Sequence, residues 1–263
     1  MRTLLAAAFS ILAVPAIAAP CGNDASGFPA WKQAFAAEAA AAGVGQAGLN
    51  ALANASYSQS TINADRNQTG VRYELNEFIR IRLGSLDSFA SQMQRERNKN
   101  PTFYASLESA YGVPTGILLA IHGMETGFGR TMGNTPVVDS ITTVAYDCRR
   151  SAFFTPHAIA ALILVDRGGL APNQRGAAHG EMGHTQFLPG NALRYGVDAD
   201  GNGRVDFYSL SDSLASTANF LRQKGWQPGQ GFQDGSANFR VLNEWNAATV
   251  YQQAIALSAA RLQ

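Results

Sequence analysis

The chain has 263 residues, of which 46% are hydrophobic, with twenty basic and nineteen acidic side chains. This near-neutral balance argues against a nucleic-acid-binding protein, which usually carries a basic excess. The hydrophobic content supports a sizeable core, and no polar tract indicates long disorder. The chain is long enough for one large domain or two closely packed lobes.

The first eighteen residues have the pattern of a secretory signal peptide. Arg2 precedes an apolar stretch at 4–14, and Ala16 to Ala18 has the small residues of a cleavage site. The apolar stretch is short for a membrane span. Pro20 stands before Cys21, where a lipidation signal would have a small residue such as Gly, Ala or Ser. We therefore predict a soluble, monomeric periplasmic protein without a membrane anchor.

The chain has only two cysteines, Cys21 and Cys148. In an oxidising compartment such a pair usually forms a disulfide. Closing so long a loop contributes about 4–5 kcal/mol in the chain-entropy treatment, and often less when measured. Two free buried thiols are the alternative.

Helices are predicted along most of the chain. Ala, Leu and Gln dominate between Trp31 and Ala53, and a break at 43–45 predicts two helices that form an N-terminal cap. Thr155 and Pro156 predict the start of a later helix, and Ser209 with Asp212 resembles a capping box. Further helices are predicted at 74–97, 102–111, 114–126, 136–146, 156–167, 211–224 and 244–261.

Strand signals are sparse, and the best candidates lie at 204–208 and 239–242. The segment 225–235 is rich in Gly, Gln and Pro and predicts a surface excursion. We find no internal repeat. The predicted class is mainly α with a small β element, as in lysozyme-like folds.

The segment from Gly116 to Arg130 predicts a helix that ends in a carboxylic acid. Pro114 can open this helix and Gly127 can close it. Residues spaced four apart share one stripe of a helix. Here that stripe is apolar until its last member, since it consists of Ile117, Ile121 and Glu125.

Glu125 is the strongest candidate for a catalytic residue. Burial disfavours an ionised carboxyl, and so does the negative end of the helix dipole. Both effects raise the pKa of Glu125, as a general acid near neutral pH requires. The alternative is a helix-end glutamate in a surface salt bridge.

Four segments match a known family in order and in spacing. They are Val113 to Gly133, Tyr146 to Arg150, Gly183 to Pro189 and Thr217 to Trp226. Together they resemble the B-type membrane-bound lytic murein transglycosylases, bacterial enzymes that cut the glycan strands of peptidoglycan. This resemblance implies a lysozyme-like catalytic region at 113–263 behind a helical N-terminal region at 19–112. The separate peptidoglycan-binding module of the family has no counterpart in this sequence, and we expect one compact unit.

A glycosidase of the usual kind uses two carboxylates. Asp139, Asp147 and Glu181 are candidates for the second, but none has a setting as suggestive as that of Glu125. The resemblance implies a reaction that needs only one, without a cofactor. Glu125 would act as acid and then as base, while the muramyl C6 hydroxyl attacks C1 of its own sugar and leaves a 1,6-anhydromuramyl end. A hydrolytic muramidase and an inactive peptidoglycan-binding protein are the alternatives.

The resemblance also implies the residues that bind the glycan strand. Arg149 and Arg150 would line the cleft and meet the acidic peptide stem. Gln186 would bridge sugar hydroxyls, and Asn246 and Tyr251 would close the cleft over the catalytic acid.

Three positions depart from the family pattern. Ala177 replaces a serine near the acid, while Phe153 and Phe220 replace cleft tyrosines. The phenylalanines keep a stacking surface but lose hydroxyl groups. We therefore expect the reaction type to match that of the family more closely than the details of substrate binding.

The segment from Asp198 to Asp206 matches an EF-hand calcium loop. Ser209 stands at position 12, where a bidentate glutamate is usual, so we expect a weakened structural Ca²⁺ site. A metal-free Asx turn is the alternative. The predicted ligands are Asp198, Asp200, Asn202, the Arg204 carbonyl and Asp206.

The four histidines predict no site. His179 and His184 are five apart and would face different directions on a helix. We expect His122 to pack or to form hydrogen bonds. A His-Glu-x-x-His zinc motif and a Gly-x-Ser-x-Gly elbow are both missing from the sequence.

Overall fold

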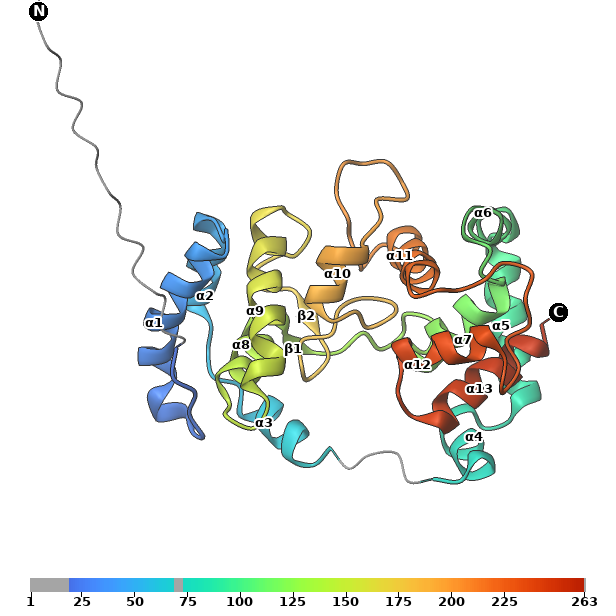
Figure 1. Ribbon diagram of the computed structural model, residues 1–263, viewed down its shortest axis with the longest axis horizontal. Helices are drawn as coiled ribbons and strands as arrows, with labels where there is room; N and C mark the ends of the chain where they lie inside the picture. The colour runs from blue at the N-terminus through green and yellow to red at the C-terminus, as the bar shows by residue number, and fades with distance from the viewer. Residues whose placement is uncertain (1–18, 69–72, 263) are drawn as a thin grey trace, which may run out of the picture.

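The computed structural model describes residues 19–68 and 73–262, so the predicted signal peptide lies outside the described residues. Within these ranges the chain forms thirteen α-helices, one short 3-10 helix and a sheet of two strands (Figure 1). The predicted class, mainly α with a small β element, is confirmed.

The helices of the first half are the 3-10 helix η1 (Ala25–Gly27), α1 (Phe28–Ala41), α2 (Gln46–Asn54), α3 (Gln59–Arg66), α4 (Leu75–Leu83), α5 (Leu86–Lys99) and α6 (Pro101–Tyr111). Those of the second half are α7 (Thr115–Thr126), α8 (Val137–Tyr146), α9 (Ser151–Asp166), α10 (Pro189–Tyr195), α11 (Leu210–Gln223), α12 (Ala237–Trp245) and α13 (Thr249–Ala260). The antiparallel strands are β1 (Thr135–Pro136) and β2 (Arg175–Gly176).

The helices pack in two groups, and α10 contacts helices of both (Figure 1). In one group α1, α2 and α3 pack with α8 and α9, and α10 packs on α9. In the other, α5, α6, α11 and α13 pack on α7, while α4 and α12 pack on α13. The helices of the predicted N-terminal region, 19–112, therefore divide between the two groups.

Helix α7 lies in the middle of the second group and is buried on all sides at its N-terminal end. Every residue from Thr115 to His122 is buried. The approach of α13 is very close, because a Cβ atom on Gly116 would lie 2.8 Å from the carbonyl oxygen of Ala259. Only glycine leaves room for the α13 backbone at this distance.

Three predicted helices have wrong bounds. The helix predicted at 244–261 begins only at Thr249, because α12 continues to Trp245 and Asn246 is extended. The single helix predicted at 74–97 is split into α4 and α5, because Gly84 has a φ of +75° and Ser85 caps the next helix by accepting from the Ser88 N–H. Helix α9 begins at Ser151, so Pro156 lies inside it. The Arg150 guanidinium lies over the buried Phe154 ring, 4.6 Å from its centroid, and this packing accompanies the earlier start.

Both predicted strands are wrong. The segment 239–242 lies in α12, where the Ser236 hydroxyl caps the first turn by accepting from the Phe239 N–H. The segment 204–208 is a loop whose backbone donates to carboxylates, with the Asp206 N–H bonded to Asp212. Helices α3 and α10 were not predicted. The excursion at 225–235 contains no helix or strand, as expected.

The predicted disulfide between Cys21 and Cys148 is present. It ties the N-terminal segment to the turn after α8. Next to it, the Gly22 N–H donates to the Tyr146 carbonyl and the Cys148 N–H donates to the Gly22 carbonyl, each at 3.0 Å. Arg149, a predicted binding residue, directly follows the disulfide-bonded Cys148.

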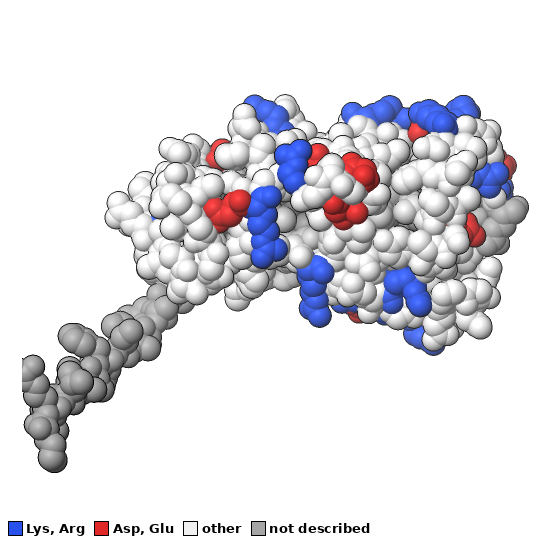
Figure 2. All heavy atoms as spheres, turned by 90° about the horizontal axis from the view of Figure 1, so that it is seen from above, with Lys and Arg blue, Asp and Glu red and all other residues white. Residues whose placement is uncertain are grey.

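On the face in Figure 2, Lys and Arg side chains stand apart among neutral ones, and a few acidic groups lie between them. No helix in the described ranges is both long enough and apolar enough to cross a membrane.

Replacing Cys21 and Cys148 together by serine should lower the free energy of unfolding by about 2–5 kcal/mol, because the unfolded chain regains the freedom of a long loop. Urea unfolding measures the loss. The wild type should lose a similar amount in reductant, whereas the serine variant should not respond to it. Equal stability of the two proteins without reductant would contradict this role.

Candidate active site

Glu125 lies in the last turn of α7, as the sequence predicted. Gly127 closes the helix with a φ of +58°, and its N–H donates to the Gly123 carbonyl at 2.9 Å. Ile117 and Ile121, which share the stripe of Glu125, are fully buried, whereas Glu125 itself is partly exposed. The apolar part of the helix thus holds a carboxyl group at the edge of the core.

Two donors hold the carboxyl group of Glu125. The Tyr251 hydroxyl donates to Oε1 at 2.8 Å, and the Trp245 indole N–H donates to the same oxygen at 3.1 Å. Tyr251 lies in the first turn of α13 and Trp245 ends α12, so the connection between these two helices brings both donors to Glu125. Oε2 has no hydrogen-bond partner among the described residues, which leaves it open to a ligand.

The environment raises the pKa of the Glu125 carboxyl, chiefly through burial. The hydrogen bonds from Tyr251 and Trp245 and the positive charge of Arg82 oppose this effect, while the charge of Glu181 adds to it. Burial outweighs the donors, so the carboxyl retains its proton at a higher pH than an exposed glutamate. This is the property expected of a general acid.

Glu125 lines two hollows. The first has a volume of about 100 Å³ and is lined by Glu125, Gln186, Phe187, Leu188, Asn191, Phe220, Glu244 and Trp245. The second, of about 460 Å³, is lined by Arg82, Leu83, Phe89, Gln92, Gly123, Met124, Glu125, Gly127, Phe128, Arg130 and Thr131. Glu125 is the one lining residue that the two hollows share.

Gln186 and Phe220 of the predicted cleft do lie beside Glu125, in the first hollow. Gln186 has a φ of +56°, which is uncommon for a residue other than glycine. Its amide donates to the Gly183 carbonyl at 2.8 Å. This bond fixes the side chain at the wall of the hollow.

Asn246 makes different contacts from those expected. Its side chain accepts from the Ala248 N–H at 3.0 Å and so caps the turn between α12 and α13. The donors that cover Glu125 are Tyr251 and Trp245. Sequence reasoning missed Trp245, although it directly precedes Asn246 in the chain.

Arg149 and Arg150 bind a buried acid. Asp65, which is 2% exposed, accepts from Arg149 at 2.5 Å and from Arg150 at 3.3 Å. Arg66 also contacts Asp65 and forms a two-pronged bond with Asp147 at 3.0 and 2.6 Å. The two predicted binding arginines are therefore oriented, and partly neutralised, by α3.

The candidates for a second carboxylate lie in other settings. Asp139 accepts from the Ser56 N–H, and Asp147 is occupied by Arg66. Glu181 accepts from the His179 N–H at 3.1 Å and is the one of the three whose charge raises the pKa of Glu125. None of the three forms a hydrogen bond to Glu125 within the described ranges.

Two histidines meet although the sequence predicted no histidine site. His122 Nε2 lies 2.9 Å from His184 Nδ1, and the Thr126 hydroxyl donates to the His184 carbonyl at 2.7 Å. Burial lowers the pKa of His122 to about 3 and also lowers the pKa of His184. Both are neutral near pH 7, so they tie the segment after β2 to α7 and carry no charge.

The loop from Asp198 to Asp206, called the calcium-type loop below, lies beside a carboxylate that the sequence did not suggest as a ligand. Carboxylate oxygens of Asp198, Asp200 and Asp212 lie within 4.8 Å of one another. Asp212, in the first turn of α11, stands three residues after Ser209, whose hydroxyl pairs with Ser211 instead. Carboxylate oxygens gathered in this way suit a hard cation such as Ca²⁺.

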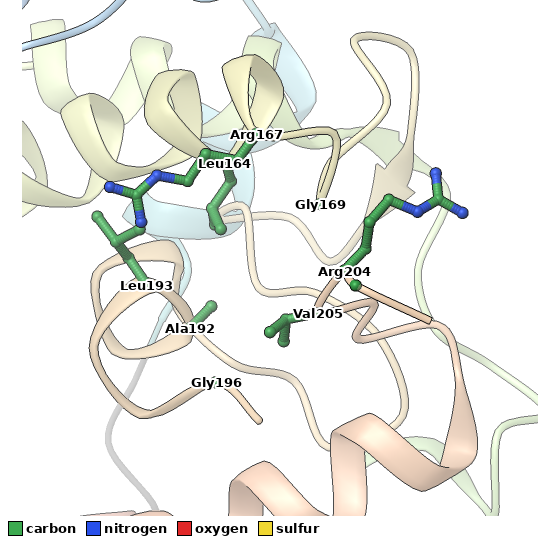
Figure 3. Close-up of a pocket in the computed structure, with 9 residues that line it drawn as sticks. Leu164, Arg167, Gly169, Ala192, Leu193, Gly196, Arg204 and Val205 are labelled. Atoms are coloured by element: carbon green, nitrogen blue, oxygen red, sulfur yellow. The ribbon is translucent and has the colours of Figure 1, made fainter. Parts of the chain in front are cut away.

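Another hollow, of about 180 Å³, lies between the calcium-type loop and helices α9 and α10 (Figure 3). Leu164, Ala192 and Val205 point into it, while the guanidinium groups of Arg167 and Arg204 extend to opposite sides. None of its lining residues is acidic. It therefore lacks the acid that cleavage of a glycosidic bond requires.

Tyr251→Phe should raise the pKa of Glu125 further, because the lost hydrogen bond stabilises the ionised form. A ¹³C NMR titration of glutamate-labelled protein measures this pKa, with the resonance assigned by its absence in Glu125→Gln. Tyr104→Phe, which removes a buried hydroxyl from α6, serves as the control and should leave the titration unchanged. An unchanged or lower pKa in Tyr251→Phe would contradict the geometry.

The sequence is similar to that of a known lytic transglycosylase. Over 121 residues the chain is 34% identical to membrane-bound lytic murein transglycosylase B of Escherichia coli (strain K12). The match covers 45% of this chain and 34% of that relative, so the chain matches about a third of the relative's length.

Solved structures agree in fold. SltB3 from Pseudomonas aeruginosa, in complex with NAG-anhNAM-pentapeptide, has a TM-score of 0.81 at 26% identity, over 89% of this chain and 79% of that one. The Escherichia coli lytic transglycosylase Slt35, in complex with calcium, has a TM-score of 0.77 at 20% identity, over 93% and 96%. The fold expected from the resemblance is thus confirmed.

The family model described as "Transglycosylase SLT domain" matches residues 27–234, most of the chain and all of the segments that carry Glu125, Gln186 and the calcium-type loop. The chain belongs to this transglycosylase family.

Proposed function

We propose that this protein is a lytic transglycosylase that cleaves the β-1,4 bond between MurNAc and GlcNAc in peptidoglycan. The observation that carries the proposal is the state of Glu125. One oxygen is held by Tyr251 and Trp245, the other is free, and burial raises the pKa of the carboxyl. Such a group can give a proton to a leaving oxygen at near-neutral pH.

The reaction balances with this one residue. The protonated Oε2 of Glu125 gives its proton to the glycosidic oxygen as the bond from that oxygen to muramyl C1 breaks. The resulting carboxylate then takes the proton of the C6 hydroxyl, whose oxygen bonds to C1 of the same sugar. The N-acetyl group of the substrate stabilises the positive charge in between, and the product carries a 1,6-anhydro ring.

The relatives support the choice of substrate. One is named for murein, and another was crystallised with a fragment that contains an anhydro-sugar. For the strand itself we propose Gln186 at the sugar hydroxyls, and Arg149, Arg150 and Asn246 at the borders of the cleft. The disulfide fits an oxidising compartment, and we propose the periplasm, reached through the signal sequence at 1–18.

Digestion of purified sacculi in ¹⁸O-water tests the reaction type. If the C6 hydroxyl is the nucleophile, the released muropeptides should carry no label and should weigh one water less than hydrolysed ones. Glu125→Gln should lose on the order of 10²–10⁴ in rate, because an amide cannot donate the acid proton. Labelled, reducing-end muramic acid as the main product would instead establish a hydrolytic muramidase.

For the loop at 198–206 we propose a structural Ca²⁺ site. Asp198, Asp200 and Asp212 fit such an ion through their gathered oxygens, and Asn202 and the Arg204 carbonyl would complete the shell. Asp206, which also accepts from the Tyr208 N–H at 2.8 Å, is the remaining ligand predicted from the sequence. The ion would stabilise the loop, and the chemistry at Glu125 would not require it.

Calcium at millimolar concentration should raise the melting temperature by about 2–4 °C over an EDTA-treated sample, because the ion binds the folded state. Asp212→Asn should abolish this rise, whereas Ser209→Ala should retain it. Differential scanning calorimetry measures both. Equal rises in the two variants would remove Asp212 from the site, and no rise in the wild type would mean that the loop binds no calcium.

A further inference from the structure

We infer that the second hollow beside Glu125 binds a carboxylate of the peptide stem, held between Arg82 and Arg130. This inference rests on the proposed function, since it assigns a part of the peptidoglycan substrate to a surface of that same site. It names two arginines other than the pair that the resemblance implied.

The two guanidinium groups border the hollow from different elements. Arg82 extends from α4, and its Nη2 donates to the Met124 carbonyl at 3.2 Å. Arg130 follows α7 and lies over the Phe128 ring, 5.9 Å from its centroid. Neither has an acidic partner within 4.0 Å among the described residues. Both therefore retain donors for a ligand.

The two hollows differ in charge. Glu125 is the one acidic residue that lines the second hollow, and no basic residue lines the first. When Glu125 holds the proton that a general acid needs, the second hollow has two positive charges and no negative one. Gln92 and Thr131 add polar groups to its wall. Paired guanidinium groups of this kind bind carboxylates through charge-assisted hydrogen bonds.

The peptide stem supplies such a carboxylate next to the reacting sugar, because stems are attached to MurNAc. Arg149 and Arg150 are already engaged by Asp65, so they have less charge to offer. A stem carboxylate in the second hollow would also oppose Arg82, whose charge lowers the pKa of Glu125. Binding of the stem would thereby favour the protonated acid.

Arg82 and Arg130 also have a possible structural role, since cations stabilise the C-terminal end of a helix. The test separates the two roles by comparing two substrates within each variant. One is a preparation of soluble glycan strands with free stem carboxylates. The other is the same preparation after carbodiimide coupling to ammonia, which converts those carboxylates to neutral amides.

The measured quantity is the ratio of kcat/KM for the two substrates, with anhydromuramyl product quantified by mass spectrometry. The double variant Arg82→Gln, Arg130→Gln should lower this preference for free carboxylates by about tenfold or more, because two charge-assisted bonds are lost. Arg95→Gln, which removes an exposed arginine of α5 outside the hollow, is the matched control and should leave the ratio unchanged.

An unchanged ratio in the double variant overturns the inference, as does an equal loss of rate on both substrates, which marks a structural role. Partial unfolding lowers both rates together and leaves the ratio intact. Equilibrium binding of the two strand preparations to Glu125→Gln protein, with and without the arginine substitutions, gives the same comparison without cleavage. If the wild type releases no anhydromuramyl product, the proposed function fails, and the binding ratio still decides the carboxylate site.

Discussion

The close contact of α7 and α13 is the constraint on which the candidate active site depends. Gly116 lets the two backbones approach, and the same crossing brings the first turn of α13 over the end of α7. Tyr251 then reaches Glu125 across 126 positions of sequence. A side chain at position 116 would separate the helices and withdraw the hydroxyl from the acid.

The state of the acid is a balance between two opposed effects. Burial favours the neutral carboxyl, while Tyr251, Trp245 and Arg82 favour the ionised form. Because the folded-state pKa is raised, the group favours folding below its unfolded pKa, and this contribution is lost as the pH rises through the folded value. The burial that keeps a proton on Glu125 therefore lowers the free energy of unfolding at neutral pH.

Local signals predicted the helix under Glu125, because its start, its glycine stop and its apolar stripe all lie within one short segment. The disulfide was also predictable, since two cysteines allow one pairing. Trp245 over Glu125 and Asp65 beneath Arg149 were not, because each pair meets only through packing between distant helices. Asp212 was mistaken for a capping residue, since its place in the first turn of α11 gives no sign that its carboxylate serves the preceding loop.

The two segments wrongly predicted as strands, 239–242 and 204–208, are also determined by side chains outside the pattern of the segment itself. Phe239 and Val241 have side chains that favour strands, but the hydroxyl of Ser236 caps a helix there. At 204–208 the carboxylates of Asp206 and Asp212 take the backbone donors that a strand partner would need. In both places a side-chain acceptor decided the backbone conformation.

The position of the disulfide has a consequence for how the chain matures. Cys21 leaves the ribosome 127 residues before Cys148, so it must stay reduced until α8 has been made. With only two cysteines there is no wrong intramolecular partner, and formation of the bond needs an oxidant but no reshuffling of mispaired bonds. The one intramolecular disulfide that the chain can form therefore fastens the N-terminal segment to the turn after α8.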